Sequence, residues 1–327
     1  MLRNPTHSRH GPDPEGNEIE FTLARAFGVG QHHDGISGTE KQHVVDDYSK
    51  QIYIGREGCK HLANRFFQET YAAPVSGQSC DYLNITVCDA IKDKDAFTVG
   101  VYSPASHSFQ QHIRLPVSGT AYRVTNAQGE TIPSDIVPVS KATDNIRRTH
   151  GSEPNELWFT VTTSPMDLVT YHVEKTTGNQ MVETSDDNSI TNGQITLTFG
   201  DGGVETLNGA KFENQLMWFN SSQGYGQNSG AYIFRPNKTD PYAINDKPTV
   251  TITKGKNVQV AEVVWSSWAS QVYRLWAGMD YVEVEWSVGP IPIKDQCDWN
   301  PKDGCSWGKE IISRYSTDIQ AQTSDGL

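Results

Sequence analysis

The chain has 327 residues, and its 27 Lys and Arg against 39 Asp and Glu give a formal net charge of -12. This length exceeds the ~100–200 residues of a typical domain, so we expect one large domain with a smaller unit, or two domains. The acidic balance argues against nucleic acid or anionic lipid as partners, and no apolar run approaches the ~20 residues that cross a bilayer.

The N-terminal part is helical in its apolar spacing. Residues 1–16 are polar, without the apolar core of a signal peptide, and we expect a disordered leader. Residues 17–73 are expected to form a small helical bundle: a first helix with Leu23, Ala24 and Phe27 on one side, and a second that follows a capping box formed by Ser37 and Glu40. The run "GREG" at 55–58 is expected to end this second helix, and a third follows up to about residue 67.

From residue 74 to residue 327 the period changes from helical to two. The run "YVEVEWSV" at 281–288 alternates as a half-buried antiparallel strand does, with Val282, Val284, Trp286 and Val288 on the inner side. Runs such as "AFTVGVY", "ELWFTVT" and "GQITLTF" share this character and are separated by turn formers. The predicted fold class is α+β, a partial three-helix bundle followed by a large antiparallel β-sandwich.

Two histidines and an aspartate stand side by side at His32, His33 and Asp34. Both residue types are Zn²⁺ ligands, and an aspartate can alternatively hold a sugar hydroxyl. Adjacent residues near a helix end diverge by about 100°, so we expect one histidine to face a site and the other to turn toward the bundle. From the residues alone, packing and capping are the favoured interpretation.

The cysteines and sequons indicate an oxidising compartment. Close spacing predicts disulfides between Cys80 and Cys88 and between Cys297 and Cys305, which leaves Cys59 without a partner. Sequons at Asn84, Asn220 and Asn237 would accept glycans there. We therefore expect a lysosomal or secreted protein, although the visible N-terminus carries no signal peptide.

A series of collinear motifs resembles one known family. "QHHDGISGTEKQHVVDDYSKQI", "LNITVC", "SGAYIFRPN", "SQVYRLW" and "VEVEWSVGPIPI" followed by "WGKEIISRY" are similar to landmarks of glycoside hydrolase family 38, the class II α-mannosidases, above all the lysosomal type. The resemblance runs from about residue 21 to residue 315. It implies a zinc-dependent retaining exo-α-mannosidase, built from an α/β barrel, a three-helix bundle and β-sandwich domains of the galactose-mutarotase type.

The resemblance also implies roles for individual residues. His33 corresponds to a zinc ligand, Asp34 to a group that holds mannose hydroxyls, and Tyr232, expected in an alternating strand, to a further substrate contact. The family supplies its nucleophile and acid/base from the barrel, so no catalytic residue is expected in this chain, which resembles an internal fragment. In lysosomal members the cysteine that matches Cys59 pairs with one upstream.

Two functions remain open at this point. The first is a fragment of an enzyme that removes terminal α-linked mannose from N-glycan oligosaccharides, inactive without the missing barrel. The alternative is a non-catalytic β module that binds carbohydrate or a protein partner. Asp46 and Asp47 resemble a catalytic carboxylate pair but point apart on a helix, and we expect surface charges.

Overall fold

The computed structural model describes residues 14–71, 78–147, 151–222, 229–230, 232–245, 247–292 and 308–320. The chain divides into two units. The helical unit holds residues up to Ser79 together with Gly100–Phe109 and Thr162–Thr170, and the sheet unit holds the remainder. Each is described by itself below.

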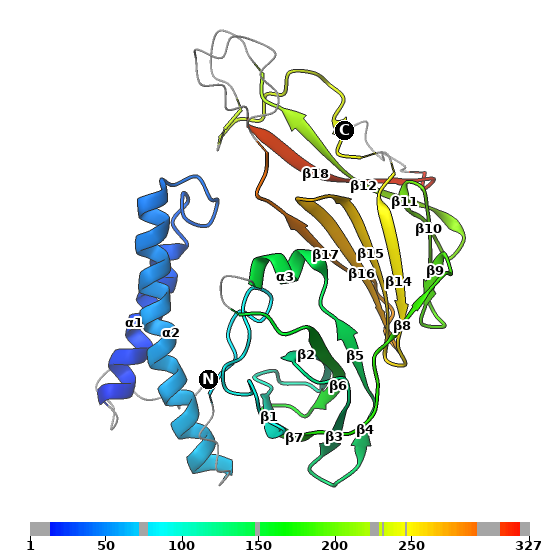
Figure 1. The fold of residues 1–327 in the computed structure, drawn as a ribbon. Helices are drawn as coiled ribbons and strands as arrows, with labels where there is room; N and C mark the ends of the chain where they lie inside the picture. Colours follow the sequence, from blue (N-terminus) through cyan, green and yellow to red (C-terminus); the bar gives the residue numbers. More distant parts are fainter. Residues whose placement is uncertain are drawn as a thin grey trace. The chain divides into compact units, whose positions relative to one another are not determined.

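The helical unit is dominated by two antiparallel helices, α1 (Pro14–Gly30) and α2 (Gln42–Tyr71), which lie side by side (Figure 1). The expected break at 55–58 is wrong, because α2 runs through it. The two glycines serve close packing instead: a Cβ on Gly55 would lie 2.6 Å from Leu23 Cα, and one on Gly58 would lie 2.8 Å from Ile19 Cγ2. The bundle is therefore represented by two long helices rather than three.

The face that α1 buries also differs from the expected one. Ala26 is 4% exposed, whereas Phe27 is 61% exposed and Ala24 is exposed too. Ile19 and Leu23 contact the glycines of α2, so the packing stripe is 19, 23 and 26, spaced by four and then three residues as a helix requires. The helix begins at Pro14, inside the expected leader. Neither α1 nor α2, as described, is long and apolar enough to cross a membrane.

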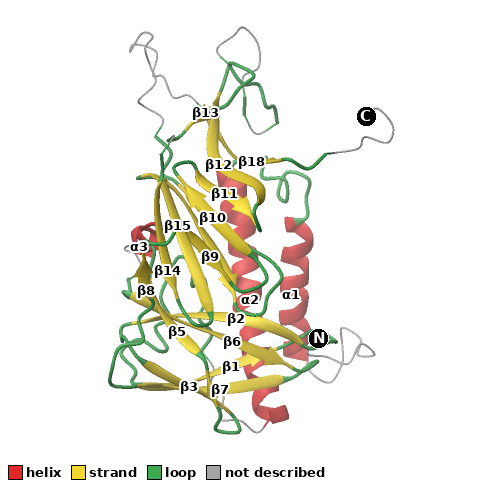
Figure 2. Cartoon of the chain, turned by 90° about the vertical axis from the view of Figure 1, so that its right-hand side faces the viewer, coloured by secondary structure: helices red, strands yellow, loops and turns green. Residues whose placement is uncertain are grey.

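The sheet unit is antiparallel in its named pairings, with strands shown in yellow in Figure 2. The strands, some of whose residues belong to the helical unit, are β1 (Ala96–Tyr102), β2 (Phe109–Val117), β3 (Tyr122–Asn126), β4 (Thr131–Ile132), β5 (Ser134–Pro138), β6 (Asn155–Thr163), β7 (Leu168–Lys175), β8 (Glu183–Ser185), β9 (Ser189–Thr191), β10 (Thr196–Gly200), β11 (Gly203–Leu207), β12 (Ala210–Asn220), β13 (Tyr242–Ala243), β14 (Thr249–Lys254), β15 (Val258–Ser266), β16 (Ala269–Trp276), β17 (Glu283–Val288) and β18 (Lys309–Thr317). A short helix, α3 (Lys141–Arg147), follows β5.

In the described residues the strands form four sheets. The four-stranded sheet has the order β1-β7-β3-β4, and the three-stranded sheet has the order β2-β6-β5. The five-stranded sheet has the order β17-β16-β15-β14-β8, and the six-stranded sheet has the order β13-β12-β11-β10-β9, with β18 paired to β12. The antiparallel β-rich region expected from the period of two is confirmed.

One core joins the five-stranded and six-stranded sheets. Leu197, Phe199 and Leu216 of one sheet pack with Trp265 and Tyr273 of the other. This is the sandwich arrangement, in which two sheets bury their inner faces against each other. The alternation of period two, hydrophobic inward and polar outward, is what allows both inner faces to be apolar.

Strand β17 shows where the alternation fails to predict burial. Val282 and Val284 pack against the core as expected, but Trp286 is 64% exposed. Because β17 is the edge strand of its sheet, a side chain on the inner face near its end has less of the facing sheet to cover it. The expectation that Trp286 belongs to the core is wrong.

The opposite face of the five-stranded sheet contacts the three-stranded sheet. Trp158 of β6 stacks on Trp276 of β16, with ring centroids 5.3 Å apart. Beside them Arg274 lies 2.9 Å from Glu283 and 2.8 Å from Glu285, and Glu285 also bonds to Arg114 of β2. An ionic cluster therefore ties β2 to β16 and β17.

The two arginines of this cluster determine the protonation state of Glu285. Burial alone would raise the pKa of Glu285, but the guanidinium groups of Arg274 and Arg114 hold it below its usual value. Glu285 therefore remains ionised into the acid range.

A disulfide joins Cys80 and Cys88, whose Cα atoms lie 5.0 Å apart. The second expected pair, Cys297 and Cys305, lies outside the described residues. Cys59 of α2 is a free thiol, and burial, with a smaller contribution from Glu20, raises its pKa. It is therefore a poor thiolate in this structure.

Candidate functional site

A tight turn carries the His-His-Asp sequence between α1 and α2. The Ile36 amide donates to the His32 carbonyl, and the Thr39 amide donates to the Asp34 carbonyl. The expected capping box is wrong, because the Ser37 hydroxyl donates to the His33 carbonyl and α2 begins only at Gln42. Ser37 therefore stabilises the turn that presents the histidines rather than the end of the helix.

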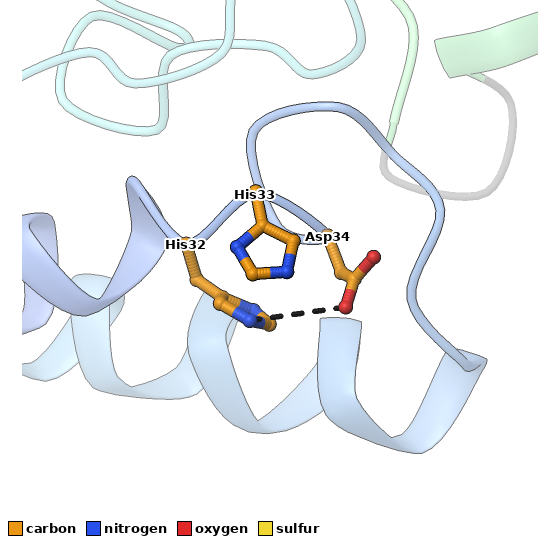
Figure 3. Close-up of side chains that lie close together, drawn as sticks. All are labelled: His32, His33 and Asp34. Atoms are coloured by element: carbon orange, nitrogen blue, oxygen red, sulfur yellow. Dashed lines mark ion pairs between the residues drawn. The ribbon is translucent and has the colours of Figure 1, made fainter.

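The turn brings three metal-binding side chains together (Figure 3). One ligand atom from each of His32, His33 and Asp34 lies within 4.8 Å of the others. The two imidazole centroids are 4.4 Å apart, and His32 Nε2 lies 3.8 Å from Asp34 Oδ2. The expectation that both histidines cannot address one small target is wrong, because these residues lie in a turn and not in a regular helix.

The second helix and the turn hold the cluster from two sides. The His32 ring lies edge-on to the Tyr48 ring of α2 at 6.5 Å, so His32 does turn toward the helices. Thr39 Oγ1 donates to Asp34 Oδ1 over 2.9 Å and fixes that carboxylate, while Oδ2 faces His32. Both histidines are exposed and Asp34 is partly buried. Sequence reasoning missed Thr39, whose signal was its place five residues after the aspartate in the motif.

Two imidazole nitrogens and a carboxylate oxygen form a donor set that suits Zn²⁺. A structural zinc site takes about four protein ligands, and a catalytic one takes about three with an open position. Within the described part of the chain, His32, His33 and Asp34 form the one group of three side chains close enough together to bind a metal ion. Their donor atoms fit zinc, and a complete zinc site would need further ligands from elsewhere.

Tyr232 lies in the sheet unit, on the connection from β12 to β13. It is in a bend rather than the expected strand, and it is 70% exposed. The Gly230 amide donates to the Ile233 carbonyl, which closes a turn around Tyr232. The alternating pattern misleads here because the backbone bends at Tyr232 instead of pairing in a sheet.

Comparison with known proteins identifies the family. Residues 178–325 match the model of the glycosyl hydrolases family 38 C-terminal domain. The lysosomal alpha-mannosidase of Homo sapiens is 31% identical over 330 residues, which cover 94% of this chain and 31% of that protein. That of Felis catus is 32% identical with the same coverage, and the alpha-mannosidase of Canavalia ensiformis is 27% identical over 91% of this chain and 33% of its own length. Over most of its length the chain is related to these alpha-mannosidases, and its residues 178–325 resemble the C-terminal domain of glycosyl hydrolase family 38.

The chain spans about a third of the length of the curated relatives it matches. The His-His-Asp turn precedes the C-terminal domain match, and Tyr232 lies within it. The carboxylates considered on α2, Asp46 and Asp47, are exposed and accept hydrogen bonds from Gln42 and Gln51. The two adjacent carboxylates are surface charges that bond in opposite directions along the helix.

The asparagines of the three sequons differ in how far they are exposed. Asn84 and Asn237 are exposed, whereas Asn220 is 8% exposed and pairs with Lys309 across β12 and β18. The Asn237 amide donates to the Tyr242 hydroxyl. Burial of Asn220 leaves no room for a glycan in the folded sheet, so that expectation is withdrawn.

Proposed function

We propose that this chain is part of a zinc-dependent retaining exo-α-mannosidase that removes terminal α-linked mannose from N-glycan oligosaccharides in a lysosomal or secreted setting. The helices correspond to the central domain of family 38, and the sheets to its galactose-mutarotase-like region. One observation carries the proposal: the His-His-Asp turn gathers three ligand atoms within 4.8 Å in the motif that resembles the family's metal site.

The residues of the turn divide the work. His33 serves as the zinc ligand, and Asp34, held by Thr39, accepts hydrogen bonds from mannose hydroxyls. His32 lies between Asp34 and Tyr48 and orients the cluster. Tyr232, which is 70% exposed, is proposed as a further substrate contact. When bound, zinc supplies a positive charge that attracts neighbouring sugar hydroxyls.

In this proposal the remaining chemistry is supplied by the barrel domain of the family. A retaining glycosidase needs a carboxylate nucleophile and a carboxyl acid/base about 5–5.5 Å apart. We therefore expect the 327-residue chain to bind zinc weakly, because each absent ligand removes binding free energy, and to release no product from an aryl α-mannoside. Metal-dependent turnover by the pure chain would contradict this assignment and direct attention to Asp46 and Asp47.

The assignment of the two histidines is tested in the chain joined to its barrel. We expect His33→Ala to empty the zinc site and abolish turnover, and His32→Ala to retain zinc with impaired activity. Metal content is measured by atomic absorption and turnover on the same samples. If His32→Ala empties the site and His33→Ala does not, the roles are reversed. If neither the extended chain nor its variants hydrolyse mannosides while the chain binds mannose, the non-catalytic module is the better description.

A further inference from the structure

His112, on β2 of the sheet unit, contacts three separate segments of the chain. Its ring stacks on Trp276 of β16, with centroids 3.9 Å apart and an interplanar angle of 1°. Its Nδ1 lies 3.0 Å from Thr160 Oγ1 of β6, and its Nε2 lies 3.0 Å from the Tyr281 hydroxyl. One titratable side chain therefore joins the three-stranded sheet to the five-stranded sheet and to the bend that precedes β17.

The bend is held differently along its length. Ala277 and Met279 are fixed through backbone bonds, the Ala277 amide to the Asn257 carbonyl and the Met279 amide to the Trp276 carbonyl. Asp280 and Tyr281 lie in the bend itself, before β17 begins at Glu283. Tyr281 is 45% exposed, and its hydroxyl reaches across 169 positions of sequence to His112. This hydrogen bond anchors the outer part of the bend.

The hydrogen bonds of His112 depend on its protonation state. A neutral imidazole has one donor and one acceptor nitrogen, and the hydroxyls of Thr160 and Tyr281 can complement either tautomer. An imidazolium donates from both nitrogens, so both hydroxyls must then accept, and the hydroxyl that donated to the neutral ring must turn its hydrogen elsewhere. Protonation therefore reverses one of the two hydrogen bonds and places a positive charge in a half-buried site.

The surroundings disfavour the charged form on balance. Burial lowers the pKa of His112, Glu283 of β17 opposes this, and Arg114 on the same strand adds to it. On β16 the facing charge, Arg274, is paired with Glu283 and Glu285. On β6, Thr160 and Trp158 are uncharged, and Glu156 is paired with Arg147. Burial, with Glu283 and Asp280, raises the pKa of Tyr281, which keeps its hydroxyl protonated.

We propose that His112 is a pH-sensitive latch, which in its neutral form holds the bend at Asp280 and Tyr281 to β2 and β6 and which loosens the bend when it is protonated. The sign follows from the lowered pKa. The folded state binds this proton less readily than the unfolded chain, whose histidines titrate near about 6.5, so the contribution of His112 to stability is present above that pH and is lost as pH falls through the folded pKa.

Hydrogen–deuterium exchange of the full chain tests the latch. At about pH 5 compared with about pH 7.5, after correction for intrinsic exchange rates, peptides covering 277–284 should lose protection severalfold. His112→Phe, which keeps a ring against Trp276 but cannot titrate, should show equal protection at both pH values. Tyr281→Phe should lower protection at neutral pH and remove its pH dependence.

The control is His172→Phe, an exposed histidine on β7 of the same unit, which should leave the pH dependence unchanged. If His112→Phe does not fold, as judged by tryptophan fluorescence, Tyr281→Phe and His112→Gln carry the comparison. Equal protection of the wild-type bend at the two pH values overturns the proposal. It is also overturned if NMR titration places the pKa of His112 at or above about 6.5.

Discussion

Gly55 determines how closely α1 and α2 approach. A methyl group added there would lie 2.6 Å from Leu23 Cα, a backbone atom that cannot move without shifting α1. Alanine is favoured over glycine in a helix interior by about 1 kcal/mol, but this steric overlap outweighs that gain. We expect Gly55→Ala to destabilise the helix pair by about 1–3 kcal/mol, measured by far-ultraviolet circular dichroism in urea.

Gly28→Ala is the matched control for that substitution. Gly28 lies in α1 with nothing within 4 Å of an added Cβ, so the same change should stabilise the helix by up to about 1 kcal/mol. If Gly55→Ala is as stabilising as Gly28→Ala, the glycine is not the point of contact between the helices.

Gly55 and Gly58 show the limit of predicting the role of a single residue from the sequence. Glycine predicts a helix break by its intrinsic preference, and only the partner helix reveals that the missing side chain is needed for packing. The His-His-Asp triplet stands out in the sequence by its residue types, and the family resemblance gives His33 and Asp34 their expected roles. Its gathering around one point was not, because the 100° rule assumes a helix that the turn at 31–38 does not form.

At the scale of elements, β12 is connected to its neighbours by a buried polar network. Asn214 is fully buried, and its Oδ1 accepts from the Gln271 amide and the Tyr273 hydroxyl, each over 2.6 Å. Its Nδ2 donates to Ser313 Oγ of β18 over 2.7 Å. Burial raises the pKa of Tyr273, so this hydroxyl remains a donor. One side chain therefore links β12, β16 and β18.

We expect Asn214→Leu to cost about 2–5 kcal/mol, since it leaves two buried donors unpaired at about 1–3 kcal/mol each. Urea unfolding followed by tryptophan fluorescence measures the loss. Gln215→Leu, the next residue on the strand, loses a hydrogen bond from Arg314 that is exposed, and should cost less than about 1 kcal/mol. Equal costs for the two variants would show that the network contributes little.

Period-two spacing predicted the strands around this network because it follows directly from the pleat. The runs at 96–102 and 156–162 lie in β1 and β6, and most of the run at 281–288 became β17. Sheet order and the buried amide network depend on pairings between strands far apart in sequence, such as β12 with β18, which no local pattern contains. Edge position, which exposes Trp286, is likewise a property of the sheet and not of the strand.

For the molecule as a whole, the two units differ in how much they bury. Among the described side chains of α1 and α2, Ala26 is the buried one, whereas the sheet unit has extended cores. All eight tryptophans lie at or after position 158, within the sheet unit, so their fluorescence reports that unit alone. Helical circular dichroism near 222 nm reports mainly α1 and α2.

We therefore expect thermal unfolding in two steps, with the circular dichroism transition at a lower temperature than the fluorescence transition. A unit with few buried apolar contacts has little hydrophobic stabilisation against its chain entropy. Coincident midpoints by the two probes would instead show that the units unfold as one cooperative structure.

The pairing of β12 with β18 has a consequence for the chain as it leaves the ribosome. Along one edge of β12, nine successive positions from Phe212 to Asn220 pair with Lys309–Thr317. At translation rates of about 5–20 residues per second, the roughly 90 residues between the two strands take about 4–18 s to appear. During that interval the long edge of β12, with Leu216 and Trp218 on it, is available to other extended segments, as unpaired edge strands are. Protection of the nascent chain, by a chaperone or by slow emergence of the segments between, is therefore most important after β12 has been made and before β18 arrives.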